Sequence, residues 1–369
     1  MLDSLYEKAL EKKDQLNNKL EIDFEKIGID PGKYWINQPI KELKTDITIS
    51  GGDGSRNWKE FLGFVIYAIN AECLIYNGKG LQKVECCDID IINPYKYVKN
   101  RLETYMGIYE IKSSLKALKE FDVDLTLFDG SLLGKLIRPS PMENNLPEWV
   151  KNEIKLKYLK KIEKSLENGS DLQIISPKLF DTIEILGENI VDSIIYLESL
   201  ENLLATRYLL KEAEKRGKSI VAISKTSTRI DYQKDHVFSS NIPDMAIFDR
   251  FSKKQGYSTP LHLNVSDRMV KRTFPIYDKF FKDLTFTIFY ARFDDFKNIL
   301  KFEIPYKATE EDIIPILESL KGICAEGYPY LLKKAHNDVV LRNREMNNIL
   351  KIMGFSSNEF STGREVVQH

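Results

Sequence analysis

The chain has 369 residues, of which 43% are hydrophobic and 30% are charged, so it can form one large packed domain or two ordinary ones. Its 54 Lys and Arg residues nearly balance its 55 Asp and Glu residues, which gives a net charge of −1. This balance excludes a uniformly basic nucleic-acid-binding protein, and any nucleic-acid surface has to be a local patch of Lys and Arg.

The N-terminal segment mixes acidic and basic residues with leucines, which is typical of neither a signal peptide nor a transit peptide. The longest apolar stretch, residues 61–76, is interrupted by Asn70 and Glu72 and is too short and too polar to span a bilayer. The four cysteines have neither C-x-x-C nor zinc-finger spacing, which argues against structural zinc and a disulfide framework. We therefore expect a cytoplasmic protein that does not contact a membrane.

Residues 3–27 carry apolar side chains at roughly helical spacing, which predicts an N-terminal helix. Gly28 and Pro31 end this helix, and a loop runs from there to about residue 44. Residues 1–44 are therefore interpreted as a separate region and as a candidate for docking a partner.

A β-meander is predicted over residues 45–87, because β-forming runs alternate there with turn signals. Asn77-Gly78 is the clearest of these turns. The strands are expected at 45–50, 58–70, 71–76 (as a continuation of the preceding strand or a separate one) and 80–87.

After the meander, helical and strand-like segments alternate. Residues 140–216 are rich in Lys, Glu and Leu, and we interpret them as a helical insertion or helical layer. The expected elements are a helix at 95–120, a strand at 125–128, helices at 148–167 and 178–216, a buried strand at 218–224, an antiparallel hairpin at 284–304, a helix at 309–325 and a final helix from near Pro329 past Val340.

A meander followed by alternating helices and strands favours an α/β fold with a mixed sheet. We expect one main domain at 45–345 that contains the helical insertion, followed by a C-terminal tail at 346–369.

The tripeptide Asp-Gly-Ser occurs twice, each time after a strand-like run. The first copy begins at Asp53 and the second at Asp129. A carboxylate held on a glycine turn just past a strand end is well placed to bind a divalent cation. A single Asp-Gly pair is usually only a turn, but two copies in this setting make the chain a candidate metal-dependent nuclease.

A metal site of this kind usually needs a third carboxylate. The helix predicted at 95–120 offers Glu103 and Glu110, which are seven residues apart and so lie on one helix face. Spacing alone does not choose between them. The core side of this helix is predicted from the stripe Ile108, Ile111, Leu115 and Leu118.

Three further residues are candidates for the same site. Lys225 follows the buried strand at 218–224 and is suited to neutralising a phosphate or orienting water, although a surface role explains it equally well. Tyr328 lies at the entrance of the last helix, with His336 about two turns along. We favour a metal-proximal role for His336 over that of proton donor, because Mn²⁺ accepts imidazole more readily than Mg²⁺ does.

These signals, in this order, resemble the NurA nuclease family of archaea and some bacteria. The resemblance covers residues 45–340, and no Walker-type or G-x-G-x-x-G loop accompanies it, so any ATP-driven step requires a partner. It rests on Asp53-Gly54-Ser55, on Asp129-Gly130-Ser131-Leu132-Leu133, on Ile223-Ser224-Lys225-Thr226-Ser227, and on Gly327-Tyr328-Pro329-Tyr330 leading to His336.

The resemblance implies a ribonuclease-H-like core and a DNA nuclease dependent on Mn²⁺, with Mg²⁺ as the alternative. It implies a homodimer that works with a HerA-type hexameric ATPase in DNA end resection, with 5′-to-3′ polarity. Among the site residues, it implies that Asp53, Asp129, Glu110 and His336 hold the metal and that Lys225 and Tyr328 complete the catalytic site, with Glu103 as the competitor of Glu110.

Two other functions are compatible with the same fold. A non-catalytic subunit that clamps DNA or docks an ATPase would lack a complete acid set, whereas Asp53 and Asp129 are both present here. A resolvase-like or Argonaute-like enzyme would share the core, but 369 residues leave no room for the extra domains of an Argonaute.

Overall fold

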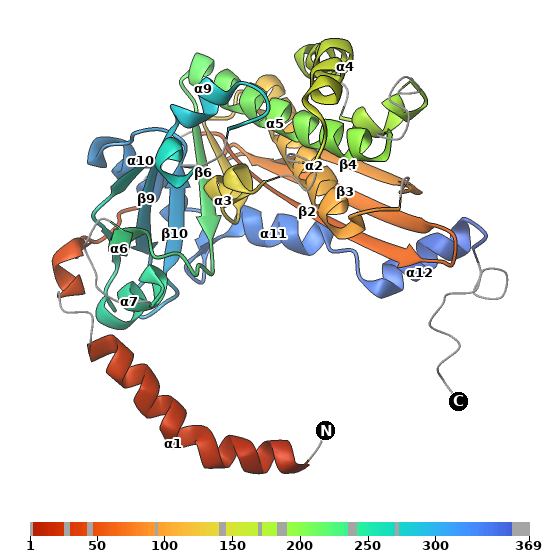
Figure 1. Cartoon of the computed structure of the whole chain (residues 1–369). Coiled ribbons are helices and arrows are strands. Elements are labelled where there is room, and N and C mark those ends of the chain that lie inside the picture. Colours follow the sequence, from red (N-terminus) through yellow and green to blue (C-terminus); the bar gives the residue numbers. More distant parts are fainter. Residues whose placement is uncertain are drawn as a thin grey trace.

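The protein is built on a ten-stranded mixed sheet with helices on both faces, as seen in a computed structural model (Figure 1). Nine of its strands follow the order β1-β7-β9-β10-β6-β5-β2-β3-β4, and β8 pairs with β9. The structure describes residues 3–25, 30–42, 47–92, 95–139, 145–168, 172–182, 190–234, 242–269 and 273–355.

Three strands at the centre of the sheet run in one direction, since β5 is parallel to both β2 and β6, and the other pairs are antiparallel. The predicted mixed α/β class is therefore correct. The strands are β1 (Trp35–Ile36), β2 (Ile49–Glu60), β3 (Val65–Tyr76), β4 (Leu81–Ile91), β5 (Leu125–Asp129), β6 (Ser219–Ser224), β7 (Gly256–Ser258), β8 (Leu261–Asn264), β9 (Thr285–Arg292) and β10 (Leu300–Ile304), and a separate hairpin joins β11 (Cys324–Ala325) to β12 (Tyr328–Pro329).

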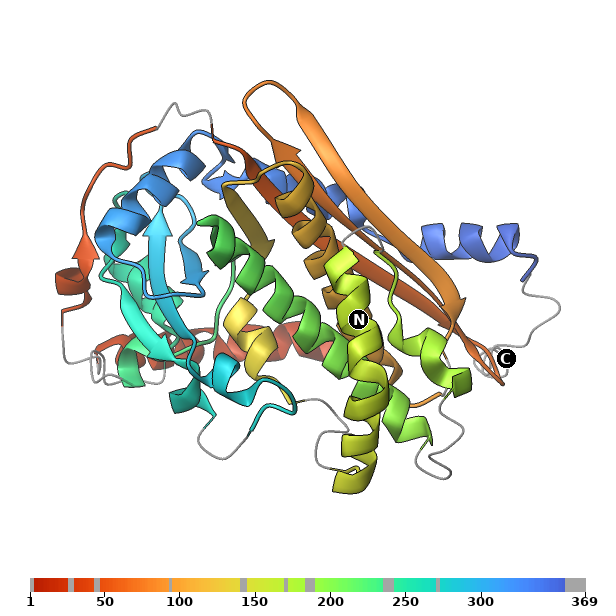
Figure 2. The same cartoon turned by 90° about the horizontal axis from the view of Figure 1, so that it is seen from above.

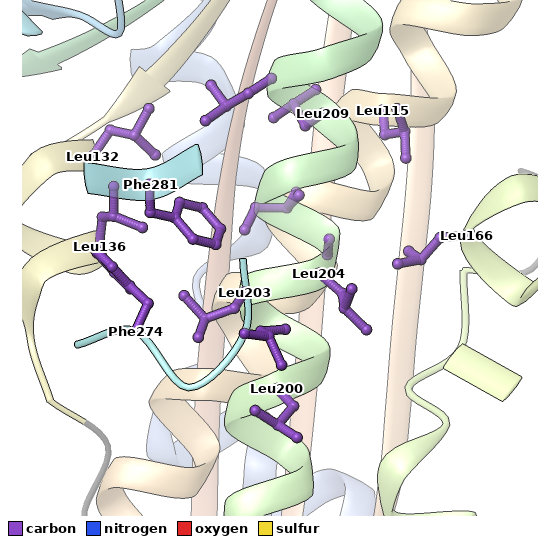
Figure 3. Close-up of a cluster of buried hydrophobic side chains, with 14 of the residues drawn as sticks. Leu115, Leu132, Leu136, Leu166, Leu200, Leu203, Leu204, Leu209, Phe274 and Phe281 are labelled. Carbon is purple, nitrogen blue, oxygen red and sulfur yellow. The ribbon is translucent and has the colours of Figure 1, made fainter. Parts of the chain in front are cut away.

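One face of the sheet is covered by α2 (Val98–Glu120), α3 (Leu132–Ile137), α4 (Glu148–Asn168) and α5 (Ile190–Arg216), as the view from above shows (Figure 2). Leucines of α3 and α5 meet there around Phe281 in the main apolar core (Figure 3). The stripe predicted on the 95–120 helix is buried, which confirms that face: Ile108, Ile111, Leu115 and Leu118.

The opposite face carries α10 (Glu310–Lys321) and α11 (Tyr330–Val339). Because side chains alternate along a strand, Leu125 and Leu127 of β5 enter this second core whereas Phe128 enters the first. The shorter helical segments are η1 (Pro31–Tyr34), η2 (Ser176–Thr182), α6 (Asp231–Lys234), α7 (Asp244–Phe251), α8 (Val265–Arg268) and α9 (Asp278–Lys282).

Helices lie near both ends of the described chain, and the first confirms the predicted N-terminal helix over its described residues. α1 (Asp3–Glu25) lies apart from the sheet (Figure 1), and its side chains are exposed from residue 3 to 19. α12 (Asn343–Ile352) crosses the predicted boundary at 345 and buries Met346 against β3. Parts of the predicted regions lie outside the described residues, namely 26–29, 43–46, 140–144, 169–171, 183–189 and 356–369.

The strand predicted at 58–70 is wrong, because the chain turns within it. The Phe61 N–H donates to the Phe64 carbonyl (2.9 Å), which closes a tight loop around Leu62 and Gly63 between β2 and β3. The long apolar run hid this turn. The hairpin predicted at 284–304 is confirmed by the antiparallel pairing of β9 with β10.

Candidate functional site

Asp53 and Asp129 lie level with each other on neighbouring strands. The parallel register pairs Gly52 of β2 with Phe128 of β5, so the next residue on each strand is one of the two aspartates. β5 ends at Asp129, whereas β2 continues to Glu60. The expected turn at Asp53 is therefore wrong, since Asp53 lies within a strand, and the strand end beside it belongs to β5.

Two glycines allow this arrangement. A Cβ at Gly54 would lie 2.7 Å from Met106 Cγ and 3.0 Å from Glu110 Oε1, so only glycine lets α2 approach β2 this closely. Gly130 has φ +92°, which ends β5 in a sharp turn. Ser131 then caps α3, where its hydroxyl accepts a hydrogen bond from the Gly134 N–H (2.8 Å).

The structure separates the two candidate glutamates of α2. Glu110 is buried, with a 7% exposed side chain, and forms an ion pair with Lys135 (2.7 Å). Glu103 is 41% exposed and pairs with Arg138 (2.9 Å) and, at 3.9 Å, with Arg56. Glu110 is the glutamate that lies against Gly54, the residue after Asp53 on β2.

Lys135 is a member of this cluster that the sequence reading missed. Burial alone would lower the pKa of Lys135, but the charge and hydrogen bond of Glu110, with Asp53 and Asp129 beyond, raise the pKa above its ordinary value. Lys135 therefore carries its charge among three carboxylates. Its position four residues after Ser131, on the helix that follows the second Asp-Gly-Ser, was the available signal.

The remaining predicted residues approach from the other face of the sheet. His336 Nδ1 of α11 lies 2.7 Å from Asp53 Oδ2. Lys225 Nζ, just after β6, lies 3.2 Å from Asp129 Oδ2 and 4.1 Å from the centre of the Tyr328 ring. All six predicted site residues thus gather around one end of β5.

Tyr328 is held as a neutral phenol beside the acids. Burial and then the charge of Asp129 raise the pKa of Tyr328 well above its ordinary value. Its hydroxyl is buried next to Asp129, without a hydrogen bond of good geometry to any described residue. The hydroxyl is therefore available as a donor to an oxygen that enters the site.

The donor set suits a hard divalent cation, because carboxylate oxygens and an imidazole are the ligands that Mn²⁺ accepts. Within the described part of the chain, no three His, Cys, Asp or Glu side chains converge as a ready-made metal cluster. Each carboxylate is instead turned toward a cation or an imidazole: Asp53 toward His336, Asp129 toward Lys225 and Glu110 toward Lys135.

A second missed residue, Glu303 of β10, supports the turn that carries Asp129. It is 1% exposed and accepts hydrogen bonds from the Ser131 hydroxyl (2.7 Å) and the Leu133 N–H (2.9 Å). Lys301, 3.0 Å away, balances its charge and also pairs with Asp231 (3.1 Å). This buried network fixes the start of α3 relative to the sheet.

Glu303→Gln is expected to weaken Mn²⁺ binding about tenfold, as is typical when a group that orients metal ligands is changed. The amide keeps the volume but loses the charge that holds Ser131. Electron paramagnetic resonance of bound Mn²⁺ measures this, with exposed Glu311→Gln as the control. Ser131→Ala should add little in the Glu303→Gln background, and full additivity of the two losses would contradict the coupling.

A pH-dependent stability is expected from Asp244, which lies in the same buried region and accepts the Tyr232 N–H (3.0 Å). Burial raises the pKa of Asp244 to about 7. Between pH 4 and 7 the unfolded chain loses this proton before the folded protein does, so stability falls as pH rises.

Asp244→Asn removes the charge and keeps the acceptor, so it should be more stable than the native protein at pH 8 by on the order of 1–3 kcal/mol and gain little at pH 4. Urea unfolding at the two pH values measures this. Exposed Asp283→Asn serves as the control, and an equal effect of Asp244→Asn at both pH values would contradict the expectation.

Together these features define an α/β protein with a candidate divalent-metal site at the end of a strand between two parallel neighbours. The chain belongs to the NurA family, since the NurA domain model matches residues 47–341. It is 29% identical to the probable DNA double-strand break repair nuclease NurA of Methanocaldococcus jannaschii, with 94% of this chain and 85% of the relative aligned. It is 25% identical to the DNA double-strand break repair nuclease NurA of Saccharolobus solfataricus, with 96% of each chain aligned.

Solved structures share the fold. The NurA nuclease from Sulfolobus solfataricus superposes with a TM-score of 0.72 at 22% identity, covering 97% of this chain and 98% of that one. A NurA structure bound to dAMP and manganese superposes with a TM-score of 0.65 at 16% identity, covering both chains completely. Among the described helices of the present protein, none is long and apolar enough to cross a membrane.

Proposed function

We propose that this protein is a metal-dependent DNA nuclease that hydrolyses phosphodiester bonds. The observation that carries the proposal is the level placement of Asp53 and Asp129 on adjacent strands, with Glu110 beside them. The relatives named as DNA double-strand break repair nucleases support the same activity.

In this proposal Asp53, Asp129, Glu110 and His336 hold the metal, which is Mn²⁺ with Mg²⁺ as the alternative. The manganese in two solved NurA structures supports this choice. A bound divalent cation supplies an activated water and charge neutralisation at the phosphate. Binding requires Lys135 and Lys225 to release their carboxylates, which frees both ammonium groups for phosphate oxygens.

The chain's own groups then have separate tasks. The Lys225 ammonium group, which lies over the Tyr328 ring, binds a phosphate oxygen. The neutral Tyr328 hydroxyl donates a hydrogen bond to the same phosphate. His336, hydrogen-bonded to Asp53, keeps that carboxylate oriented and would itself be a ligand of the bound metal. Lys135 compensates the charge of Glu110 when DNA is absent.

We further propose that the core is ribonuclease-H-like and that the nuclease domain contains a helical insertion at about 140–216. The domain limits predicted at 45 and 345 are too narrow, because β1 pairs within the sheet and α12 packs on β3. The meander β2-β3-β4 beside the parallel strands β5 and β6 supports this proposal, as does the family match over 47–341. The deeply buried face of α5 supports interpreting the insertion as a structural layer.

The cellular role proposed is DNA end resection in the cytoplasm by a homodimer that works with a HerA-type hexameric ATPase and degrades strands from 5′ to 3′. The alternative is a non-catalytic subunit that clamps DNA or docks the ATPase. The complete acid set around Asp129 favours the enzyme.

Incubating the full-length protein with single-stranded and double-stranded DNA ends tests the proposal. Cleavage should require Mn²⁺ or Mg²⁺ and stop with EDTA, and strands labelled at either end report the polarity. DNA binding without cleavage under every metal condition would favour the non-catalytic alternative.

The exposed apolar face of α1 is proposed as the ATPase-docking element. Leu5, Leu10 and Leu16 are 59%, 77% and 54% exposed, so these side chains lack a partner within the described chain. Removing residues 1–27, or introducing Leu10→Glu with Leu16→Glu, should abolish binding to a HerA-type ATPase.

Basal nuclease activity and melting temperature should stay unchanged in these variants, because α1 does not pack on the sheet. Lys8→Glu with Lys12→Glu is the matched control on the same helix. Undiminished ATPase binding by the truncated protein, measured by calorimetric titration, would rule out α1 as the docking element.

A further inference from the structure

A groove of about 740 Å³ lies between β3, β4 and the end of α11. None of the six predicted site residues lines it, so it is separate from the proposed catalytic site. β4 is the last strand in the sheet order, which places the groove at the edge of the sheet. The proposed nuclease chemistry leaves this groove without a role.

Four polar side chains form a square in this groove. The antiparallel register pairs Asn70 of β3 with Cys87 of β4, and Glu72 of β3 with Glu85 of β4. Directly paired residues point to the same face of an antiparallel sheet, and so do residues two apart along one strand. All four residues line the groove, so their side chains surround one position above the sheet.

The two side chains from β3 carry oxygen atoms without a donor. Glu72 is 5% exposed, and its buried Oε2 accepts no hydrogen bond from a described residue. Asn70 Oδ1 is also buried and accepts no hydrogen bond from the described part of the chain. A buried acceptor of this kind costs free energy, which a cation bound in the groove would recover.

The groove is acidic as well. Glu72 and Glu85 lie directly opposite each other, and like charges in this arrangement destabilise a sheet. Lys83 Nζ lies 2.6 Å from Glu85 Oε1 but 3.9 Å from Glu72 Oε1, which is beyond hydrogen-bond distance. Asp338, on the α11 side, is paired with Lys334 of its own helix. The Lys83 side chain is 55% exposed, so an entering cation can displace its ammonium group into water.

We propose that this groove is a further divalent-cation site, in which Glu72, Glu85 and Asn70 supply oxygen ligands and water completes the coordination. Carboxylate and amide oxygens are the ligands of hard cations such as Ca²⁺, Mg²⁺ and Mn²⁺. The bound cation joins β4 to β3 and so holds the edge of the sheet beside β2, which carries Asp53 opposite Glu72. None of its ligands belongs to the proposed catalytic site, so cation binding here does not require that the protein cuts DNA.

Mn²⁺ binding to the full-length Asp53→Ala/Asp129→Ala protein isolates this site, because the two substitutions remove proposed catalytic ligands. Electron paramagnetic resonance should detect one bound Mn²⁺ with a dissociation constant of about 1 mM or below, as in other open sites with few charged ligands. Adding Glu72→Gln should weaken this binding at least about tenfold, since one of two carboxylate ligands is lost. Exposed Glu311→Gln is the control and should leave it unchanged, and Glu85→Gln serves if the Glu72→Gln protein does not fold.

Lys83→Met separates a cation site from an ordinary surface ion pair. Removing the competing ammonium group should strengthen Mn²⁺ binding by about threefold or more, because the cation no longer has to displace it. If Lys83 is instead the natural partner of the two glutamates, Lys83→Met produces no gain in Mn²⁺ binding, and the site is overturned.

Cys87 reports whether the groove is occupied. It is exposed beside the ligands, whereas Cys73 and Cys86 are buried. Saturating Ca²⁺ should therefore slow the modification of Cys87 by iodoacetamide, measured by peptide mass spectrometry, and Glu72→Gln should remove this protection. Modification of Cys324, which lies outside the groove, should not respond to Ca²⁺.

The cation site and the nuclease function fail differently. If the Asp53→Ala/Asp129→Ala protein binds no Mn²⁺, or binds it equally well with Glu72→Gln, the cation site is overturned while the nuclease function stands. If the native protein cuts no DNA with any metal but Mn²⁺ binding still depends on Glu72, the nuclease function fails and the cation site stands.

Discussion

Asp53→Ala and Asp129→Ala should each abolish metal-dependent DNA cleavage, with a rate loss of at least about 10²–10³-fold. The two carboxylates lie level on adjacent strands, and each variant removes one side of the proposed metal site. Removing one ligand leaves the remaining carboxylate and Glu110 unable to hold the cation in place. Single-turnover cleavage of labelled DNA with Mn²⁺ measures the effect.

Both variants should fold, because neither aspartate contributes to an apolar core. The side chains of Asp53 and Asp129 are 14% and 21% exposed, and their partners in the structure are His336 and Lys225. Asp338→Ala is the matched control, since it removes another carboxylate of α11, one that pairs with Lys334 on the same helix. Normal cleavage by a folded Asp53→Ala or Asp129→Ala protein would exclude the metal-site assignment.

The sequence was sufficient to predict most elements near the site, because each depended on local patterns. The stripe on α2, the strand ending at Asp129 and the buried strand β6 all followed from apolar spacing and turn residues. The Asp53 turn was predicted wrongly for the same reason. Asp-Gly-Ser is a turn signal locally, but pairing with β3 along its whole length keeps β2 extended through it.

Contacts between side chains that are distant in the sequence explain why some residues of the site were not predicted. Lys301 and Glu303 alternate with apolar residues in β10, a pattern typical of a strand with one solvent-exposed face. The structure buries both, because Asp231 and Ser131 come from distant segments to pair with them. Lys135 is likewise defined only by its contact with Glu110, which no spacing rule reveals.

The choice between the glutamates of α2 also required the structure, and it leads to a direct test. Glu110→Gln should remove most of the DNA-cleaving activity, roughly 10²-fold or more, because a neutral amide neither binds a divalent cation strongly nor balances Lys135. Glu103→Gln should be milder, within about tenfold, since Glu103 is partly exposed and faces Arg138 and Arg56.

The two substitutions are matched in chemistry and lie on the same helix, so each controls for the other.

Gly54 gives a further reason to expect a larger effect at Glu110 than at Glu103, because the lack of a side chain at Gly54 lets Glu110 Oε1 approach β2. Gly54→Ala should therefore mimic Glu110→Gln by displacing that carboxylate, and it should not mimic Glu103→Gln. A larger loss of Mn²⁺-dependent cleavage from Glu103→Gln than from Glu110→Gln would show that the third carboxylate of the site lies two turns nearer the start of α2.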